Sequence, residues 1–545
     1  MKLELLLTVG LGSSLTILHT NDVHSHYDPT NELGMDCSEA QVKAGQCYGG
    51  MARLKGQIDR IRANRSDVLL LDAGDQFQGS MYYTYYKGNA SWEFMNLLKY
   101  DAMTLGNHEF DDGVENLARV IANFNFPVVC ANVVGLEDSV VPYTKFPQHD
   151  LAVVGYITES TGRLSKTGSA VNFLDPAPVV QGVVDKLRSE GVSNVIALSH
   201  NGYFEDKQLA STTRGIGLII DGHSHSYLSS ASAKPPSLGK YPTAVRNLDG
   251  ETVYIIQAYC WGRFLGHVDV TFRPDGYLQS IEGAPIELTT DLPQDPKALQ
   301  LMASLSKPFD SFRKKKVGYA SADFTEGHCQ SEECAMGNLM ADALLYKRIP
   351  FGGQIALMNS GGIRATFSKG PITAQQVLAV LPFDNQVTQF PMTGQEIWDM
   401  FASAIERKSR SNGLPIISFV QVAGIRYSYD PKSLKLLSIH VFKSKYHPIV
   451  RTETYQVVAA DFLATGGDNL IVPPRLNLTG HGIQSQVLME YLSSHNPITP
   501  TLDSRITLAS HTLRLSPTNN LLHLATNPSW RPVPILSCLF LRCHV

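Results

Sequence analysis

Residues 15–24 read Leu-Thr-Ile-Leu-His-Thr-Asn-Asp-Val-His, an apolar run that ends in two side chains able to bind a metal ion. Aliphatic and β-branched residues dominate the first half of this stretch, which predicts a buried strand. Asp22 and His24 follow directly, one residue apart. Because layered α/β proteins bind ligands at the carboxyl ends of their strands, we expect this strand end to supply metal ligands.

The first half of the chain repeats this pattern of an apolar run with a polar end. Further runs predict buried strands, at residues 68–71, 128–130, 152–157, 195–198 and 218–220. Apolar residues at helical spacing lie between them, at residues 51–63, 92–99, 114–123 and 179–190. Asp75, His200 and His223 each stand just after one of the apolar runs. The alternation predicts a mixed α/β layered domain that carries its functional side chains at strand ends.

These polar residues have the chemistry of a two-metal phosphoesterase. Phosphoester hydrolysis at neutral pH needs a nucleophilic hydroxide and neutralised phosphoryl oxygens, and two metal ions about 3.5–4 Å apart supply both. We assign Asp75, in a tight Gly-Asp turn, as the carboxylate shared between the ions. The other expected ligands are Asp22, His24 and His225 for one ion, and Asn107, His200 and His223 for the other.

The types of ligand indicate which metal binds, and their number supports the prediction that a metal binds at all. Mixed nitrogen and oxygen donors favour zinc, manganese or iron over magnesium or calcium, which prefer oxygen ligands. A single acid or histidine at a strand end is more often a cap or a satisfied polar group. The prediction of a metal centre therefore depends on the whole set and not on any one member.

The segment Gly-Asn-His-Glu-Phe-Asp at residues 106–111 also carries a candidate acid catalyst. If a helix begins there, the three-residue gap brings Asp111 close enough to orient His108. An oriented imidazole beside a metal centre can stabilise or protonate the leaving oxygen. The alternative is a structural pair with no part in the chemistry.

A helical pattern from about residue 293 to residue 316 separates the two halves of the chain. It ends in the basic run Arg313–Lys316, which is more simply a solvated helix terminus than a membrane or nucleic-acid patch. A second α/β unit follows, with strands expected at 354–358 and 455–460 and helices at 395–407 and 484–493. We therefore expect a domain at 15–292, a linker helix at 293–316 and a second domain at 317–509.

The composition describes a globular protein that does not bind nucleic acid. The chain has 545 residues, enough for two domains with full cores. Hydrophobic residues make up 43% and charged residues 18%, and the net charge is −4. A negative chain cannot bind nucleic acid by neutralising many phosphates. An anionic substrate must therefore be attracted locally, by metal ions or by a few arginines.

The first residues and the cysteines indicate an extracellular protein. Residues 1–14 combine Lys2 with an apolar stretch, which predicts a signal peptide, although an ordinary first strand is the alternative. Two close cysteine pairs, Cys37 with Cys47 and Cys329 with Cys334, predict local disulfides and fit zinc binding less well. Cys130 and Cys260 stand in apolar surroundings, which favours buried thiols. Three sequons indicate a glycoprotein, at Asn64, Asn89 and Asn477.

Residues 510–545 differ in character from the rest of the chain. They are polar and contain prolines, and they end in a short apolar run at 533–541. A lipid-anchor signal needs a hydrophobic tail of about 10–20 residues. We therefore favour a disordered or atypical tail over a membrane anchor, and membrane association stays open.

Three segments together resemble the 5'-nucleotidase family, in particular ecto-5'-nucleotidase and its salivary apyrase relatives. They are residues 17–24, residues 106–111 and the Asn-Ser-Gly-Gly-Ile-Arg segment at 359–364. The resemblance covers roughly residues 15–509. It implies an N-terminal calcineurin-like metallophosphoesterase domain with two divalent ions, usually zinc in the animal enzymes. It also implies a C-terminal α/β domain that binds the nucleoside, a helix that permits domain rotation, and a homodimer.

The resemblance assigns roles to individual residues. His108 and Asp111 correspond to the family's catalytic dyad, and His225 stands where relatives carry Gln or Asn. In the second domain it implies substrate binding by Asn359, phosphate binding by Arg364, base stacking by Phe383 and Phe462, and ribose binding by Asp468. Phenyl faces stack on any nucleobase, and a carboxylate accepts hydrogen bonds from both ribose hydroxyls. Without the resemblance, both phenylalanines would be interpreted as core residues.

One position departs from the family pattern. Ecto-5'-nucleotidases carry an arginine just after the first cysteine of the Cys329–Cys334 pair, and this chain has Gln330 there. A neutral amide replaces a permanently charged bidentate donor, so phosphate affinity or the preferred phosphate-chain length can differ.

The leading hypothesis is a metal-dependent enzyme that hydrolyses nucleoside 5'-monophosphates such as AMP. The alternative within the same chemistry is an apyrase that cleaves ATP and ADP with the same residues. A third hypothesis, from a different class, is a secreted protein that binds nucleotides or amines without turning them over. The intact ligand set argues against this third hypothesis, and Gln330 argues weakly for it.

Overall fold

The structure is a computed structural model that describes residues 14–509 except 33, 35–36, 38, 166, 231–234, 325–328, 384 and 476–477. Residues 1–13 of the predicted signal peptide, the sequon at Asn477 and the tail at 510–545 lie outside the described residues. Within the described part of the chain, no helix has the length and apolar character that a membrane crossing requires.

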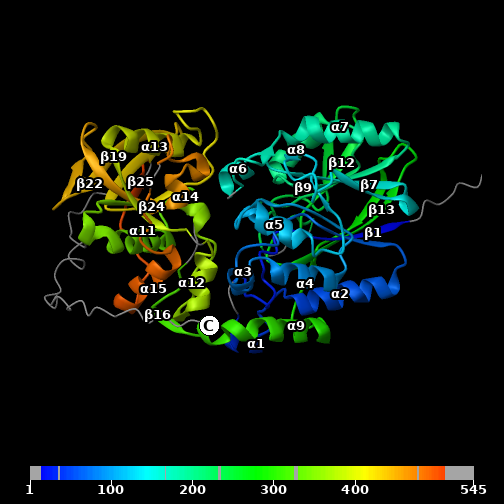
Figure 1. The fold of residues 1–545 in the computed structure, drawn as a ribbon, viewed down its shortest axis with the longest axis horizontal. Coiled ribbons are helices and arrows are strands. Elements are labelled where there is room, and N and C mark those ends of the chain that lie inside the picture. Colours follow the sequence, from blue (N-terminus) through cyan, green and yellow to red (C-terminus); the bar gives the residue numbers. More distant parts are fainter. Residues whose placement is uncertain are drawn as a thin grey trace, which may run out of the picture.

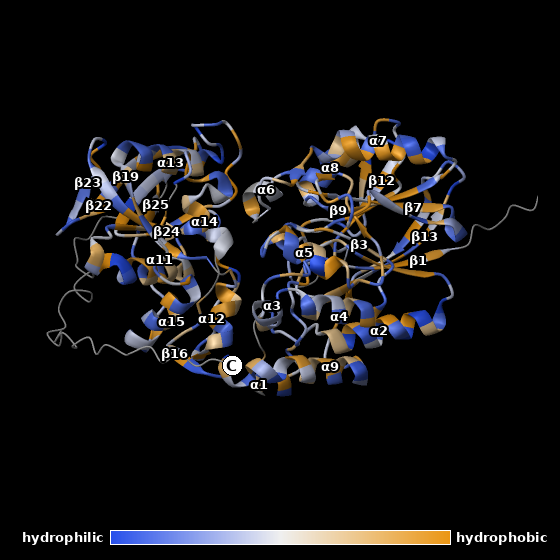
Figure 2. Ribbon diagram, in the orientation of Figure 1, coloured by the Kyte–Doolittle hydropathy of each residue, from blue (hydrophilic) through white to orange (hydrophobic). Residues whose placement is uncertain are grey.

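Two lobes lie side by side, and the chain passes between them along one edge (Figure 1). The N-terminal lobe contains the elements from β1 to β15, and the C-terminal lobe contains those from β16 to β25. In Figure 2 the strands at the centre of both lobes are mostly hydrophobic, whereas the helices also carry hydrophilic residues. Each lobe therefore has its own core, as the alternation of strands and helices predicts.

Two facing sheets form the centre of the N-terminal lobe. The first has the order β14 (Leu278–Gly283), β13 (Phe264–Phe272), β1 (Leu15–Thr20), β2 (Val68–Asp72), β3 (Ala102–Thr104) and β4 (Val128–Val129), with β15 (Ile286–Glu287) also paired to β13. The second has the order β11 (Thr243–Arg246), β12 (Thr252–Ile256), β10 (Leu218–Ile220), β9 (Asn194–His200), β7 (Leu151–Ile157) and β6 (Tyr143–Phe146). One buried cluster contains residues of both sheets, including Ile17 and Ile196. The lobe is therefore a sandwich of two sheets.

Helices and short elements cover this sandwich. The helices are α1 (Glu39–Lys43), α2 (Met51–Asn64), α3 (Met81–Tyr86), α4 (Asn89–Leu98), α5 (Val114–Ile121), α6 (Thr161–Leu164), α7 (Pro176–Ser189) and α8 (Tyr203–Thr212). Short 3-10 turns form η1 (Asn107–Phe110) and η2 (Pro147–His149), and β5 (Val133–Val134) pairs with β8 (Asn172–Phe173). Residues of α2 and α4 pack with Leu18, Leu70 and Met103 on the outer face of the first sheet.

Strand direction brings the predicted ligands to one edge of the sandwich. β1, β2, β3 and β4 run parallel, with Thr20 opposite Asp72. β7, β9, β10 and β12 also run parallel, with Leu198 opposite Ile220. Parallel strands buried on both faces have near-continuous apolar sequences, which is why these runs could be recognised. The loops after these strands start at matching positions, so their side chains can converge.

The linker differs from the single helix predicted for residues 293–316. Its elements are α9 (Pro296–Ser306), η3 (Lys307–Phe309) and α10 (Asp310–Arg313), and Lys316 already belongs to β16 (Lys316–Ala320). Pro308 lacks a backbone N–H and fits only the first turn of a helix, so α9 cannot continue through it. The basic run therefore ends one short helix and begins a strand.

The described residues of the C-terminal lobe form three sheets. The first has the order β19 (Val387–Thr393), β24 (Thr454–Ala460), β17 (Ile355–Asn359) and β20 (Val420–Ala423). The second has the order β23 (Tyr446–Pro448), β22 (Lys435–Phe442), β21 (Ile425–Asp430) and β25 (Ile506–Leu508). In the third, β16 pairs with β18 (Gly370–Thr373). The helical elements are α11 (Ala335–Arg348), η4 (Ile349–Phe351), η5 (Ser360–Gly362), α12 (Ala374–Val380), α13 (Gly394–Glu406), α14 (Asp461–Ala464), η6 (Gly467–Asn469) and α15 (Gln484–Ser494). Leu378 of α12 packs into the N-terminal lobe's cluster beside Met81 and Phe309, so the two lobes contact each other.

The cysteine predictions are confirmed for the described residues. Cys37 bonds to Cys47, and Cys329 bonds to Cys334. Cys130 and Cys260 are free and buried.

Candidate active site

Two clusters of ligand side chains lie at the carboxyl edge of the sandwich. Asp22, His24 and His225 bring their ligand atoms within 4.8 Å of one another, and so do Asp75, His200 and His223. The sequence assigned His225 to the first cluster and His200 with His223 to the second, and the structure groups them in the same way. Asn107 begins η1, and its buried side-chain oxygen has no hydrogen-bond partner.

Asp75 stands between the two clusters. Its Oδ2 lies 3.2 Å from His200 Nε2 and 3.8 Å from His24 Nε2. Its Oδ1 accepts a hydrogen bond of 2.8 Å from the backbone N–H of His108. One carboxylate oxygen therefore faces ligands of both clusters, the geometry that a shared ligand needs.

The donor set fits two metal ions. His24 Nε2 and His225 Nε2 face each other at 3.0 Å, and His225 Nε2 lies 3.3 Å from Asp22 Oδ1. His200 Nε2 is buried and faces Asp75 Oδ2, and the backbone carbonyl of Ala73 lies 2.6 Å from its Nδ1. A hydrogen bond at Nδ1 fixes the tautomer and leaves Nε2 to bind a metal. The unpaired, buried Asn107 Oδ1 is an atom that a cation would satisfy.

The electrostatics of the site favour cations as well. Burial opposes a charge on His200, but the nearby carboxylates, chiefly Asp75, outweigh it and raise the pKa of His200 to about 10. Burial is the main cause that lowers the pKa of His24 well below its usual value and that of His223 to about 3. The site therefore combines a field that attracts positive charge, at His200, with two imidazoles, His24 and His223, for which burial favours the neutral, ligating form.

The ligand loops have unusual backbone conformations. Asp22, His24, Asp75, His223 and His225 all have φ between 48° and 71°, a region that residues other than glycine rarely adopt. Such conformations persist where the surrounding structure fixes them, and they cluster at functional sites. The loops are therefore built to present these side chains.

Glu109 fixes two of these loops, and the sequence did not reveal it. This buried carboxylate accepts hydrogen bonds from the backbone N–H groups of Asp75, Gln76, Phe77 and Gly106, at 2.6–3.1 Å. It thereby joins the loop that carries Asp75 to the loop that carries Asn107. Its place inside the 106–111 segment was the available signal, but its partners come from a distant part of the chain.

His108 and Asp111 form the pair predicted from their spacing. His108 Nδ1 lies 2.7 Å from Asp111 Oδ2, and Gln78 Nε2 donates to the same oxygen at 2.9 Å. Burial lowers the pKa of His108, but Asp111 and Asp75 outweigh this effect and raise the pKa above its usual value. Nε2 of this oriented ring is therefore available to hold a proton.

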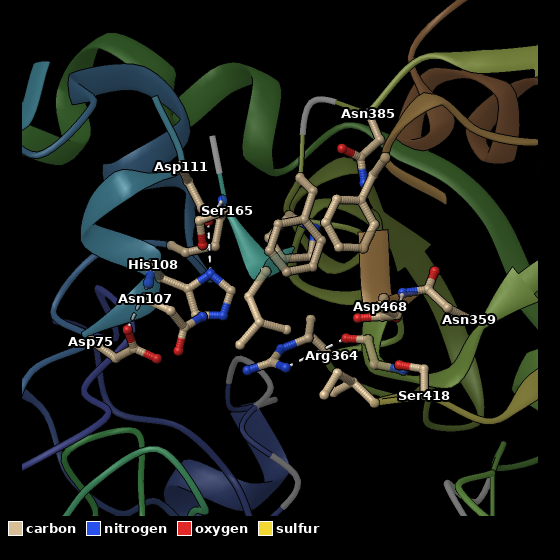
Figure 3. Close-up of a pocket in the computed structure, with 18 of the residues that line it drawn as sticks. Asp75, Asn107, His108, Asp111, Ser165, Asn359, Arg364, Asn385, Ser418 and Asp468 are labelled. Carbon is tan, nitrogen blue, oxygen red and sulfur yellow. Dashed lines mark hydrogen bonds and ion pairs between the residues drawn. The ribbon is translucent and has the colours of Figure 1, made fainter. Parts of the chain in front are cut away.

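One pocket joins the cluster of Asp75 and His223 to the C-terminal lobe (Figure 3). Its lining contains Asp75, Asn107, His108, Asp111 and His223 from the first lobe, and Asn359, Arg364, Phe383, Phe462 and Asp468 from the second. All five substrate residues predicted for the second lobe thus line the same space as three of the predicted metal ligands, Asp75, Asn107 and His223. In Figure 3 the labelled side chains of the two lobes face each other across this space.

The polar residues of the C-terminal side are held in place. Asn359 Nδ2 donates to Asp468 Oδ2 at 2.8 Å, and both residues are buried. Phe383 and Phe462 are partly buried, and the Phe383 ring lies 5.5 Å from the His108 ring at an angle of 26°. The aromatic face from one lobe therefore stands directly against the imidazole of the other.

Gln330 lies near this pocket without lining it. Its Oε1 accepts a hydrogen bond of 3.0 Å from the Ser360 hydroxyl, next to Asn359, and Arg407 donates to its backbone carbonyl. Among the described residues, the cationic side chains that line the pocket are Arg364 and Lys87. Sequence reasoning also missed Gln78, Lys87, Leu164, Ser165, Ile417 and Ser418 of the lining, because nothing in their local sequence sets them apart.

Comparisons with known proteins match both lobes of the chain. The family model described as calcineurin-like phosphoesterase matches residues 15–227, and the model described as 5'-nucleotidase, C-terminal domain, matches residues 315–474. The chain is 35% identical to a human 5'-nucleotidase over 90% of both chains. It is 31% identical to a snake venom 5'-nucleotidase of Naja atra, over 92% of this chain and 99% of that protein.

A solved structure gives the same result. The crystal structure of a 5'-nucleotidase precursor from Thermus thermophilus matches with a TM-score of 0.84 and 34% identity. The match covers 91% of this chain and 100% of that chain. Both lobes and the linker between them therefore have counterparts in one known structure.

Proposed function

Because the chain belongs to the 5'-nucleotidase family, we propose that it hydrolyses nucleoside 5'-monophosphates, such as AMP, to a nucleoside and phosphate. The observation that carries this proposal is the single pocket lined by Asp75 and His223 on one side and by Arg364, Phe383 and Asp468 on the other. A nucleotide in this pocket would place its phosphate toward Asp75 and His223 and its nucleoside toward the second lobe.

The phosphate end depends on two divalent metal ions. When bound, such ions supply a nucleophilic hydroxide at neutral pH and neutralise the phosphoryl oxygens. Asp22, His24 and His225 would hold one ion, Asn107, His200 and His223 the other, and Asp75 would contact both. Because the donors are mixed nitrogen and oxygen atoms, zinc is the metal proposed, with manganese as the alternative.

Residues of the chain itself complete the phosphate site. Arg364 lines the pocket and adds a permanent positive charge for the phosphoryl oxygens. His108, oriented by Asp111, donates a proton to the leaving 5'-oxygen of the nucleoside. The Asp111–Gln78 hydrogen bond keeps that carboxylate aimed at the ring.

The nucleoside end depends on the C-terminal lobe. Phe383 and Phe462 offer two aromatic faces for the base, and such stacking does not depend on which base is bound. Asp468, held by Asn359, accepts hydrogen bonds from the ribose hydroxyls. The two lobes together therefore bind one nucleotide.

The two disulfides support an extracellular location, since such bonds persist in oxidising compartments. The homodimer expected from the resemblance stays a prediction, and sedimentation of the purified protein would test it.

The second candidate is an apyrase, which would cleave ATP and ADP with the same residues. Gln330 stands where the resemblance leads us to expect an arginine, so the preferred phosphate-chain length can differ. Phosphate release from AMP, ADP and ATP, measured in parallel, separates the two functions. We expect AMP to be the best substrate, and hydrolysis of ADP with inert AMP would refute this proposal.

A further inference from the structure

The loop after β10 carries histidines of both metal clusters. His223 belongs to the cluster with Asp75 and His200, whereas His225 belongs to the cluster with Asp22 and His24. Both have left-handed backbone, with φ of 71° and 48°. A loop that must aim two neighbouring side chains at different ions from such a conformation needs support from outside.

Gln257 gives this support along the whole length of the loop. It directly follows β12 and is fully buried. Its side-chain nitrogen, which carries two hydrogens, has three acceptors within hydrogen-bond distance: Asp221 Oδ2, the Gly222 carbonyl at 3.1 Å and Ser224 Oγ at 3.1 Å. Its side-chain oxygen accepts from the backbone N–H of Ser226. One amide therefore bonds to the loop before, between and after the two histidines.

The residues after Gln257 hold the first ligand loop as well. The Ala258 N–H donates to Asn21 Oδ1 at 2.9 Å, and Asn21 Nδ2 donates to Asp22 Oδ2 at 2.7 Å. The Trp261 N–H donates to the Asp22 carbonyl at 2.7 Å. Segment 257–261 is thus a common support for the first and the last ligand loops.

We propose that Gln257 is a positioning residue that sets the separate directions of His223 and His225 and thereby the affinity for the two metal ions. This inference rests on the metal assignment of the proposed function. Groups that orient metal ligands typically change metal affinity by about 10- to 100-fold when they are removed.

The variant Gln257→Met tests the inference, since methionine keeps the size of the side chain and removes its hydrogen bonds. Titration of the apoprotein with Zn²⁺ and with Mn²⁺ gives the affinity, and elemental analysis after dialysis gives the metal content. We expect affinity to fall about 10- to 100-fold and fewer than two ions per chain to remain. Raising the free metal concentration should restore AMP hydrolysis.

Gln421 provides a matched control. It is also fully buried, and it bonds to the Cys329 carbonyl at 2.8 Å, the Glu332 carbonyl at 2.7 Å and the Cys334 N–H at 3.3 Å, far from the metal ligands. Gln421→Met should lower the melting temperature of the apoprotein and leave metal affinity unchanged. If Q257M lowers the melting temperature in the same way but binds two ions with wild-type affinity, Gln257 is merely structural and the inference is overturned.

Ser224→Ala keeps the inference testable if Q257M does not fold. Ser224 is exposed, so we expect the variant to fold. It removes one of the four contacts of Gln257, together with the bonds of the Ser224 hydroxyl to the Tyr203 N–H and to Ser226 Oγ. We expect a smaller loss of metal affinity in the same direction, and wild-type affinity would count against the inference. A wild-type protein that binds two ions but releases no phosphate from AMP would refute the proposed function alone.

Discussion

The two lobes bury their functional side chains to different depths. In the N-terminal lobe, Asp22, Asp75 and His200 are at most 2% exposed, and they start from strand ends. In the C-terminal lobe, Arg364, Phe383 and Phe462 are only partly buried, the first two on loops and Phe462 in the short helix α14. Most of the residues proposed for chemistry are buried, with Asp111, His223 and His225 partly exposed, whereas three of the five proposed for recognition are partly exposed.

Backbone conformation shows the same contrast. Five ligand residues of the N-terminal lobe have left-handed backbone, and Glu109 and Gln257 hold their loops from behind. Among the five proposed substrate residues of the C-terminal lobe, only Asp468 has positive φ. A rigid centre suits bond cleavage, which depends on sub-ångström placement, whereas aromatic stacking tolerates movement. Substitutions in the first lobe should therefore lower activity more, through kcat and kcat/KM. Substitutions in the second lobe should mainly change KM.

The largest effect is expected at Asp75. Asp75→Asn removes the charge that faces both metal clusters, and we expect kcat/KM for AMP to fall by more than about 10³-fold. Metal content should fall below two ions per chain by elemental analysis. Glu190→Gln, at an exposed ion pair with Lys145, is the control and should keep full activity. A D75N protein with two ions and a tenth of normal activity would contradict the assignment.

The next effect is expected at the pair of His108 and Asp111. His108→Asn should lower kcat for AMP by about 10²- to 10⁴-fold while both ions stay bound. The acid form of His108 exists below its pKa, which Asp111 and Asp75 raise against the effect of burial. Activity should therefore decline as pH rises through this raised pKa.

The variant Asp111→Asn sharpens this prediction. Loss of the carboxylate lowers the pKa of His108, so the alkaline limb of the kcat profile should move to lower pH. Profiles of wild type and variant measured side by side check this. An alkaline limb that stays in place would mean that another group supplies the proton.

A smaller effect is expected at the aromatic residues of the second lobe. Phe462→Ala removes one stacking face, which is worth about 1–3 kcal/mol per base, so KM for AMP should rise about 5- to 150-fold. Both kcat and metal content should change little, in contrast to the first lobe. Phe351→Ala, an exposed residue of the same lobe outside the pocket lining, should leave KM unchanged. A loss in kcat alone would contradict the proposal that the first lobe performs the chemistry and the second binds the nucleoside.

The smallest effect is expected at Gln330, which is exposed. Gln330→Arg adds a permanent charge near the phosphate side, and an exposed charge of this kind is worth under about 1 kcal/mol, so KM for AMP should fall no more than about fivefold. The ratio of kcat/KM for AMP to that for ADP measures whether phosphate-chain preference changes. Gln330→Lys adds a point charge without the planar fork of an arginine side chain, so KM for AMP should fall by a smaller factor. An unchanged KM in both variants would show that this position does not contact the substrate.

The sequence predicted those features that depend on local pattern. The strands before Asp22, Asp75, His200 and His223 were visible because strands buried in a parallel sheet are continuous apolar runs. The break in the linker helix was not predicted, because helical periodicity continues on both sides of it. Pro308 was the available signal, since it cannot continue α9.

Features that depend on distant partners were not predictable. Glu109 contacts the backbone of Asp75, which is 34 positions away, and Gln257 contacts Ser226, 31 positions away. The residue type alone does not predict that a side chain holds a ligand loop, because a buried glutamate or glutamine can form hydrogen bonds with many kinds of partner. Phe383 and Phe462 had the sequence of core residues, and only the resemblance to a known family gave them a function.

Stepwise reconstitution tests the central claim most directly. Metal-free protein is titrated with Zn²⁺, and phosphate release from AMP is measured at each step together with bound metal. Activity should be absent from the apoprotein and should reach its plateau at two ions per chain. Full activity without metal, or a plateau at one ion per chain, would contradict a two-metal centre that Asp75 joins.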